Sequence, residues 1–279
     1  MIIDYAMTGI CNARCEFCWD MFKGQTGVSI DKVMDVFPKL YAAGIENICV
    51  TGGEPLLHPG VDDILTYLKE VGFHIYLSTN GAFLEEHLDT VVNCVDLIGL
   101  PIDSLCETSN RNLGRLSQQA SITLKNIQLI KSSAENIRIK IGTVLTNANK
   151  DELIDIGTAL YNAPYSPDVW RIYQFAPIAM GEHYYDKYVI GDDDANSIIH
   201  MCRIQFQGHT IDYLPNERPL GSYIFITPSL KVVSFREDNT LEEYSPLDMS
   251  MMELQNLIDS HKEISLKNRQ VLYRELEKI

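Results

Sequence analysis

Hydrophobic positions follow two spacings along this chain, one typical of buried strands and the other of amphipathic helices. Short runs of aliphatic and β-branched residues predict strands over 2–6, 45–51, 74–79, 95–102, 137–145 and 169–175. Apolar residues three or four positions apart predict helices from 30 to a stop at Gly44, from 61 to a stop at Gly72, and over 117–133 and 150–163. Strands that alternate with helices indicate right-handed βαβ units around a parallel sheet. The sequence therefore predicts an α/β fold, a partial (β/α)6 TIM-like barrel.

This alternation ends after Pro177. The polar, tyrosine-rich stretch 181–194 predicts a loop, and the runs 223–226 and 231–235 around Pro228-Ser229 predict a β-hairpin. Helical segments are expected from Ser250 and from Glu263. We therefore expect a core barrel over 1–180 and a C-terminal cap over 181–279, within one structural unit.

Three cysteines, Cys11, Cys15 and Cys18, stand in one short segment after the first predicted strand. Cysteine thiolates are the usual ligands of iron–sulfur clusters, and three of them would leave one corner of a [4Fe–4S] cube open for chemistry. A zinc site or a chance group of buried thiols is the alternative. Structural zinc, however, takes four ligands, usually as two separated pairs, and no second CxxC pair follows.

Composition narrows the class of protein further. The 279 residues carry a net charge of −15, which argues against bulk nucleic acid as a partner but leaves room for a small anion in a locally basic pocket. The first residues lack the basic segment of a signal peptide, and no apolar run approaches the roughly 20 residues of a membrane span. The seven cysteines are an odd number and do not predict a disulfide framework. We expect a cytoplasmic protein without a membrane partner.

Two further segments end predicted strands with polar or glycine residues. Thr51-Gly52-Gly53-Glu54-Pro55 follows the second strand, where glycines let the backbone approach a ligand and a carboxylate can accept hydrogen bonds from an ammonium group. By itself this segment is an ordinary strand-to-helix turn. Ser78-Thr79-Asn80-Gly81 ends the third strand, and Ser78 and Asn80 lie one strand period apart, so both can point into the mouth of a barrel.

The CxxxCxxC spacing, with the aromatic Phe17 before the last cysteine, together with the GGEP and Ser-Thr-Asn-Gly segments, resembles radical S-adenosylmethionine (SAM) enzymes. The resemblance implies that Cys11, Cys15 and Cys18 bind a [4Fe–4S] cluster, whose open iron takes the amino and carboxylate groups of SAM. It further implies cofactor contacts for Phe17, Gly52, Gly53, Glu54, Pro55, Ser78, Asn80, Asp103 and Thr143. The resemblance also implies that Lys140 in the fifth strand and Tyr173 in the sixth are catalytic residues that touch SAM or substrate.

Parts of the chain are also similar to viperin-like members of the family, which dehydrate a nucleoside triphosphate. These parts are the segment from Asp103 to Arg115, the strand at 170–175 and the segment 222–226. The chain departs from the viperin-like pattern before the cysteines, where Ile3 and Tyr5 replace an asparagine and a histidine. Gly142 likewise replaces an asparagine in the fifth strand.

The resemblance implies that a flavodoxin- or ferredoxin-like donor reduces the cluster and that SAM is cleaved to a 5′-deoxyadenosyl radical. This radical would remove hydrogen from a C–H bond of a small polar metabolite, such as a nucleotide, nucleoside or sugar derivative. One alternative is modification of a ribosomal peptide by epimerisation or cross-linking, although no leader-binding domain is apparent. The other is an iron–sulfur electron-transfer or zinc-binding module, which would not need the GGEP segment.

Cys106 lies just past the fourth predicted strand, at the expected mouth of the barrel. A thiol there could donate a hydrogen atom to a substrate radical, because its S–H bond is weaker than the C–H bond that forms. The alternative is that Cys106 is a small buried hydrophobic residue.

Overall fold

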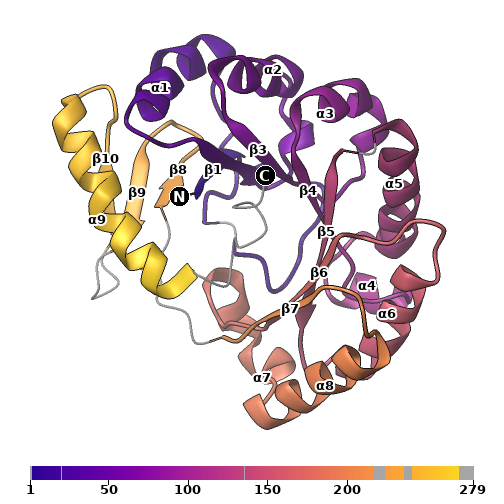
Figure 1. Ribbon diagram of the computed structural model, residues 1–279. Coiled ribbons are helices and arrows are strands. Elements are labelled where there is room, and N and C mark those ends of the chain that lie inside the picture. The colour runs from indigo at the N-terminus through magenta and orange to yellow at the C-terminus, as the bar shows by residue number, and fades with distance from the viewer. Residues whose placement is uncertain (1, 20, 135, 217–223, 236–240, 270–279) are drawn as a thin grey trace. The chain divides into compact units, whose positions relative to one another are not determined.

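A computed structural model of the chain describes residues 2–19, 21–134, 136–216, 224–235 and 241–269 (Figure 1). The fold separates into two compact units. Unit 1 consists of Met1–Ile10, Phe22–Leu77 and Glu217–Ile279, and unit 2 consists of Cys11–Met21 and Ser78–Asn216. Among the described residues, no helix is both long and apolar enough to cross a membrane.

Unit 1 is built on a mixed sheet. Its parallel part contains β1 (Ile2–Thr8), β2 (Asn47–Gly52) and β3 (His74–Ser78), with β8 (Ile224–Ile226) parallel to β1 on the other side. Antiparallel strands β9 (Val232–Phe235) and β10 (Leu241–Tyr244) extend it beyond β8. The predicted first three strands and the hairpin are thus confirmed, apart from Ser222 and Tyr223, which lie outside the described residues.

The helices of unit 1 bury an apolar face against this sheet. In Figure 1, α1 (Ile30–Ala42) and α2 (Val61–Val71) lie next to each other beside the parallel strands. Phe37 and Leu40 of α1 and Leu65 and Leu68 of α2 are fully buried, as their helical spacing predicts. Gly72 ends α2 with φ +112°, a conformation that favours glycine.

The C-terminal helix corrects one prediction. A single helix, α9 (Met251–Arg269), replaces the two segments expected from Ser250 and Glu263. No glycine or proline stands between residues 250 and 269, so nothing in the local sequence breaks the helix.

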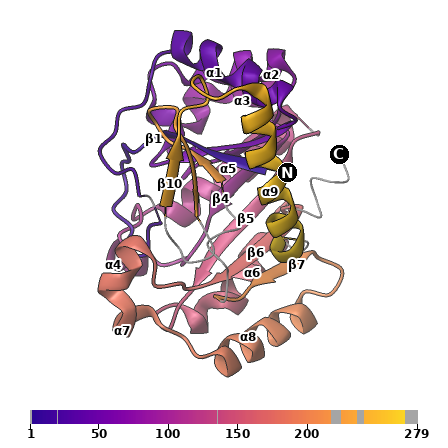
Figure 2. The same cartoon turned by 90° about the vertical axis from the view of Figure 1, so that its left-hand side faces the viewer.

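Unit 2 contains a parallel sheet in the order β4 (Leu97–Pro101), β5 (Arg138–Leu145), β6 (Val169–Gln174) and β7 (Ile211–Leu214). Helix α3 (Leu88–Cys94) precedes β4, and α5 (Gln119–Ser133), α6 (Leu153–Tyr161) and α8 (Asp192–Gln205) connect the later strands (Figure 1). Helix α8 lies beside β7 in both views (Figure 2). The fourth to sixth predicted strands are confirmed. The parallel strand β7 is an addition, and the division at residue 180 stays a prediction.

The stretch 181–194 is helical, and the predicted loop is wrong. A 3₁₀ turn over Ala179–Tyr184 leads into α7 (Tyr185–Tyr188), and α8 begins at Asp192. Three aspartates fill the first turn of α8, where carboxylates interact favourably with the helix dipole. Tyr188 is fully buried in a cluster with Leu113 and Phe175. The polar and aromatic composition therefore reflects a helix start and a packed cluster.

Candidate active site

The cysteine segment of unit 2 forms a turn with three reduced thiols. The Cys18 amide donates to the Cys15 carbonyl at 3.2 Å, and the sulfur of Cys11 is exposed while the other two are partly buried. Burial raises the pKa of the Cys15 thiol to about 11; the Arg115 cation opposes this, and the Cys18 and Cys11 thiols add to it. Metals bind the thiolate form, so metal binding at Cys15 releases the thiol proton.

These residues fit a cubic cluster better than a single metal ion. Within the described part of the chain, no three His, Cys, Asp or Glu side chains converge as ligands of one ion. A [4Fe–4S] cube is held by thiolates at its different irons, so its ligands do not need to meet at one point. Three thiols in one turn suit that group, whereas structural zinc requires four converging ligands.

The segment after α4 (Glu107–Asn112) holds the cysteine turn through its backbone. The Arg14 amide donates to the Gly114 carbonyl at 2.9 Å, and the Glu16 amide donates to the Leu113 carbonyl at 3.1 Å. Gly114 has φ +74°, and a Cβ there would lie 2.1 Å from the Arg14 carbonyl oxygen. Only glycine allows this close approach.

Arg115 places a partly buried cation beside the turn. Its Nε lies 2.5 Å from Oδ2 of the fully buried Asp103, and its guanidinium carbon lies 5.2 Å from the centre of the Phe17 ring. Burial lowers the pKa of Arg115, but Asp103 and Cys15 raise it by more, so the guanidinium stays charged. Asp103 was predicted to contact the cofactor, whereas Arg115 was named only as the end of the segment that is similar to viperin-like enzymes. The signal for Arg115 in the sequence was its position directly after Gly114, in the same segment as Asp103.

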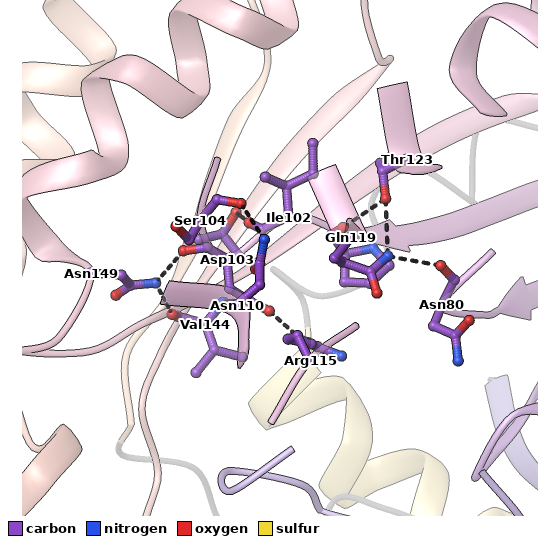
Figure 3. Close-up of polar contacts among 12 residues, drawn as sticks. Asn80, Ile102, Asp103, Ser104, Asn110, Arg115, Gln119, Thr123, Val144 and Asn149 are labelled. Atoms are coloured by element: carbon purple, nitrogen blue, oxygen red, sulfur yellow. Dashed lines mark hydrogen bonds and ion pairs between the residues drawn. The ribbon is translucent and has the colours of Figure 1, made fainter. Parts of the chain in front are cut away.

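A network of buried polar side chains fixes the ends of β4 and β5 (Figure 3). The second oxygen of Asp103 accepts from the Val144 amide at 2.7 Å. Asn149 donates to the carbonyls of Asp103 and Val144 at 2.8 and 2.9 Å, and Asn110 donates to the Ser104 carbonyl at 3.1 Å. Every one of these contacts joins a side chain to strand-end backbone, so Asp103 is held rigidly at the end of β4.

The buried face of α5 performs the same task for the predicted SAM-binding segment at 78–81. Gln119 donates to the Asn80 carbonyl, Thr123 to the Pro101 carbonyl and Asn126 to the Gly81 carbonyl, each at 2.8 Å (Figure 3 shows the first). The Asn80 side chain in turn donates to the Asn12 side chain at 2.6 Å. Asn80 therefore contacts the cysteine segment directly, while Ser78 is half-buried at the end of β3.

The GGEP segment of unit 1 is shaped by close backbone contacts. The Gly53 amide donates to the Thr8 carbonyl at 2.6 Å, and the Glu54 amide donates to the Ile10 carbonyl at 2.8 Å. A Cβ on Gly53 would lie 2.3 Å from the Ile10 carbonyl oxygen, so the segment requires glycine. The fully buried Glu54 carboxylate accepts from the Leu56 amide at 3.1 Å, one residue beyond Pro55.

The remaining predicted residues of unit 2 lie on both faces of its sheet. Thr143 is fully buried on the face that carries Trp170; its hydroxyl donates to the Ile102 carbonyl at 2.5 Å and accepts from the Trp170 indole at 2.9 Å. Lys140 points to the opposite face, where it donates to the Tyr173 hydroxyl at 3.0 Å. A contact between Thr143 and SAM stays a prediction, as do the other residue assignments.

Cys106 is exposed just before α4 rather than buried. Backbone amides of Ser109 and Thr108 and the Ser109 side chain lower the pKa of its thiol. The alternative of a small buried hydrophobic residue is therefore wrong, and the hydrogen-donor role stays a prediction.

Comparison with known proteins identifies the class. The model of the radical SAM superfamily matches residues 5–158, more than half of the 279 residues, and the chain belongs to that superfamily. The chain is thus an enzyme that uses a [4Fe–4S] cluster and SAM, as the motifs predicted. The alternatives of a zinc-binding or electron-transfer module are excluded.

Two curated relatives act on nucleotides according to their names. The chain is 26% identical over 251 residues to an S-adenosylmethionine-dependent nucleotide dehydratase of Psychrobacter lutiphocae, covering 82% of this chain and 80% of that protein. It is 27% identical over 194 residues to a GTP 3′,8-cyclase of Clostridium perfringens, covering 65% of this chain but only 58% of the cyclase.

Solved structures show the fold. SuiB of Streptococcus suis bound to S-adenosylmethionine matches with a TM-score of 0.71 and 13% identity over 95% of this chain and 67% of SuiB. The enzyme anSMEcpe with bound AdoMet matches with a TM-score of 0.68 and 14% identity, over 91% and 80% of the two chains. At such identities the likeness concerns the fold alone, and it confirms the predicted α/β partial barrel.

Proposed function

We propose that this radical SAM enzyme acts on a small anionic metabolite of the nucleotide class. The observation that carries the proposal is a pair of buried cations, Lys140 on β5 and Arg171 on β6, in a chain of net charge −15. Gly142 pairs with Arg171 across the two strands, and Lys140 lies two residues before Gly142. Both cations thus project from one face of the sheet.

The surroundings of the two cations suit phosphate oxygens. Arg171 Nε lies 2.7 Å from Asp212 Oδ2, and Tyr173, two residues further along β6, receives the Lys140 hydrogen bond. A guanidinium carries five N–H donors and an ammonium three, which allows each to serve an anion beside its protein partner. The names of the two relatives support the same class of substrate.

We assign the cofactor contacts residue by residue. Cys11, Cys15 and Cys18 hold the cluster; the segment Gly52 to Pro55 takes the amino group of SAM, with Glu54 as the charged acceptor. Phe17, Ser78, Asn80 and Asp103 complete the cofactor contacts, whereas the buried Thr143 hydroxyl, bonded to the Ile102 carbonyl and the Trp170 indole, is assigned none. When bound and reduced by a flavodoxin- or ferredoxin-like donor, the cluster supplies the electron that cleaves SAM to methionine and the 5′-deoxyadenosyl radical.

An anaerobic assay tests this function. The reconstituted protein is incubated with SAM, a chemical reductant and individual deuterated nucleotides, and deuterium in 5′-deoxyadenosine is followed by mass spectrometry. We expect transfer from one nucleotide, and none from a Cys15→Ala variant, which lacks one cluster ligand. Cleavage of SAM without deuterium transfer from any nucleotide or nucleoside would contradict the proposed substrate class.

Peptide modification is the second candidate. SuiB bound to its precursor peptide SuiA matches this chain with a TM-score of 0.70, although 12% identity shows the fold alone. Deuterated peptides in the same assay distinguish the two candidates.

A further inference from the structure

The two residues between Cys15 and Cys18 are Glu16 and Phe17, and both contact the same side chain of α7. The Tyr188 hydroxyl donates to Glu16 Oε2 at 2.5 Å. The Tyr188 ring meets the Phe17 ring edge-on, with centroids 5.8 Å apart and planes at 79°. Tyr188 therefore contacts both residues that connect the second and third cysteines.

Lys187 strengthens this contact from the neighbouring position. Its ammonium donates to the same Glu16 oxygen at 2.5 Å and to the Asn112 carbonyl at 3.1 Å. Tyr188 also reaches the Asn112 carbonyl, at 3.3 Å. Asn112 directly precedes Leu113 and Gly114, whose carbonyls accept from the cysteine turn. Residues 187 and 188 thus connect the turn to the backbone segment that supports it.

The hydroxyl of Tyr188 serves this contact rather than packing alone. The ring lies in an apolar cluster beside Phe175, 5.7 Å away, where a phenylalanine would fill the same space. A buried hydroxyl is unfavourable unless it is hydrogen-bonded, and its single proton here goes to Glu16, with the Asn112 carbonyl as the more distant acceptor at 3.3 Å.

We propose that Tyr188 is a positioning residue for the cluster-binding turn. Tyr188 and Lys187 together hold Glu16 and Phe17, and this arranges Cys15 and Cys18 for iron before iron binds. The proposal rests on the proposed assignment of the three cysteines as cluster ligands. A turn that is already ordered loses less conformational freedom on binding, so the cluster should load more completely and leave more slowly.

The cysteines of unit 2 provide a readout that needs no cluster. In the anaerobic apoprotein, alkylation of each cysteine is followed by mass spectrometry, with exposed Cys106 and buried Cys202 as internal references. Tyr188→Phe keeps the ring and removes the hydroxyl. We expect Cys15 and Cys18 to react about tenfold faster in this variant, the effect of one lost hydrogen bond to a charged group, while Cys106 and Cys202 react as before.

The loaded protein gives a second readout. We expect iron loss to a chelator to be about tenfold faster in Tyr188→Phe, for the same reason. Tyr185→Phe is the matched control, because Tyr185 lies in the same short helix but is 49% exposed; it should leave both rates unchanged. Glu16→Ala removes the acceptor of the Tyr188 hydroxyl, so adding Tyr188→Phe to Glu16→Ala should raise either rate less than Tyr188→Phe does in the unaltered protein.

The possible results distinguish a failure of the proposal for Tyr188 from a failure of the assignment of the cysteines. Unchanged alkylation and iron loss in Tyr188→Phe would overturn the proposal, and so would a parallel rise at Cys202, which would indicate general destabilisation. Failure of the unaltered protein to retain iron would instead overturn the assignment of the cysteines, while alkylation of the apoprotein would still test Tyr188.

Discussion

At the scale of single residues, Cys106 shows how local bonding limits the chemistry of a thiol. Hydrogen-atom donation requires the S–H form. The exposed side chain receives hydrogen bonds from the Ser109 and Thr108 amides and from the Ser109 side chain, which stabilise the thiolate and lower the pKa. If Cys106 is the proposed donor, its active form is lost as pH rises, at a lower pH than for an ordinary cysteine.

This leads to a pH-dependent prediction. The amount of product formed per SAM cleaved should fall as the pH rises through the lowered pKa of Cys106. Ser109→Ala should move this fall to higher pH, because it removes a hydrogen bond that stabilises the thiolate. Cys106→Ala should cleave SAM without forming product, measured by mass spectrometry in deuterated buffer. Normal product formation by Cys106→Ala would show that the thiol donates nothing.

At the scale of elements, helices and short turns of unit 2 support the proposed site through backbone contacts. Helix α5 uses Gln119, Thr123 and Asn126, three polar residues on its buried face, to bind strand-end carbonyls. The segment at Gly114 does so for the cysteine turn. These polar positions are tolerated in a buried face because each side chain donates to a backbone carbonyl, although the side-chain oxygen of Gln119 is buried without a partner among the described residues.

Gly114 offers the sharpest test at this scale. Gly114→Ala should destabilise the fold by about 1–2 kcal/mol, because residue 114 has a left-handed backbone conformation. It should also lower the iron content of the protein, because the new Cβ would meet the Arg14 carbonyl. Gly208→Ala is the matched control, since Gly208 has φ +89° and no atom near its Cβ position. It should show the stability loss in thermal unfolding but bind iron normally. Equal iron contents in the two variants would contradict a supporting role for Gly114.

At the scale of the whole molecule, a net charge of −15 makes the placement of each buried cation informative. Because an acidic surface repels anions, a phosphorylated substrate needs locally positive groups. Lys140→Met should therefore raise the KM for the nucleotide by roughly 10- to 100-fold, the effect of a lost hydrogen bond to a charged group. Lys125→Met, which breaks an exposed ion pair with Glu85, should leave KM unchanged. An equal change in both variants would point to general electrostatics.

The local signals of the sequence were sufficient for the class of enzyme and for most elements. Cysteine spacing, the GGEP segment and hydrophobic periodicity each depend on residues close together in the chain, so they are readable without a fold. The strands β1 to β6, the hairpin strands β8 and β9 and the helices α1, α2, α5 and α6 accordingly lie where the pattern places them, whereas β7 and β10 were not predicted. The short helices α3, α4 and α7 were missed, because a few residues carry too little periodicity. The longer helix α8 was missed as well, because it begins with three aspartates and buries only Ala195, Ile199 and Cys202.

The support of the cysteine turn depends instead on contacts between distant residues. Glu16 and Tyr188 are separated by 172 positions, and no pattern within a window of sequence connects them. Arg115 contacts Asp103 because the chain folds back at a glycine turn. In the tyrosine-rich stretch after residue 180, Tyr188 packs into an apolar cluster with Leu113 and Phe175, which are distant in sequence. Local chemistry is encoded residue by residue, whereas burial and hydrogen-bond partners exist only once the chain has folded.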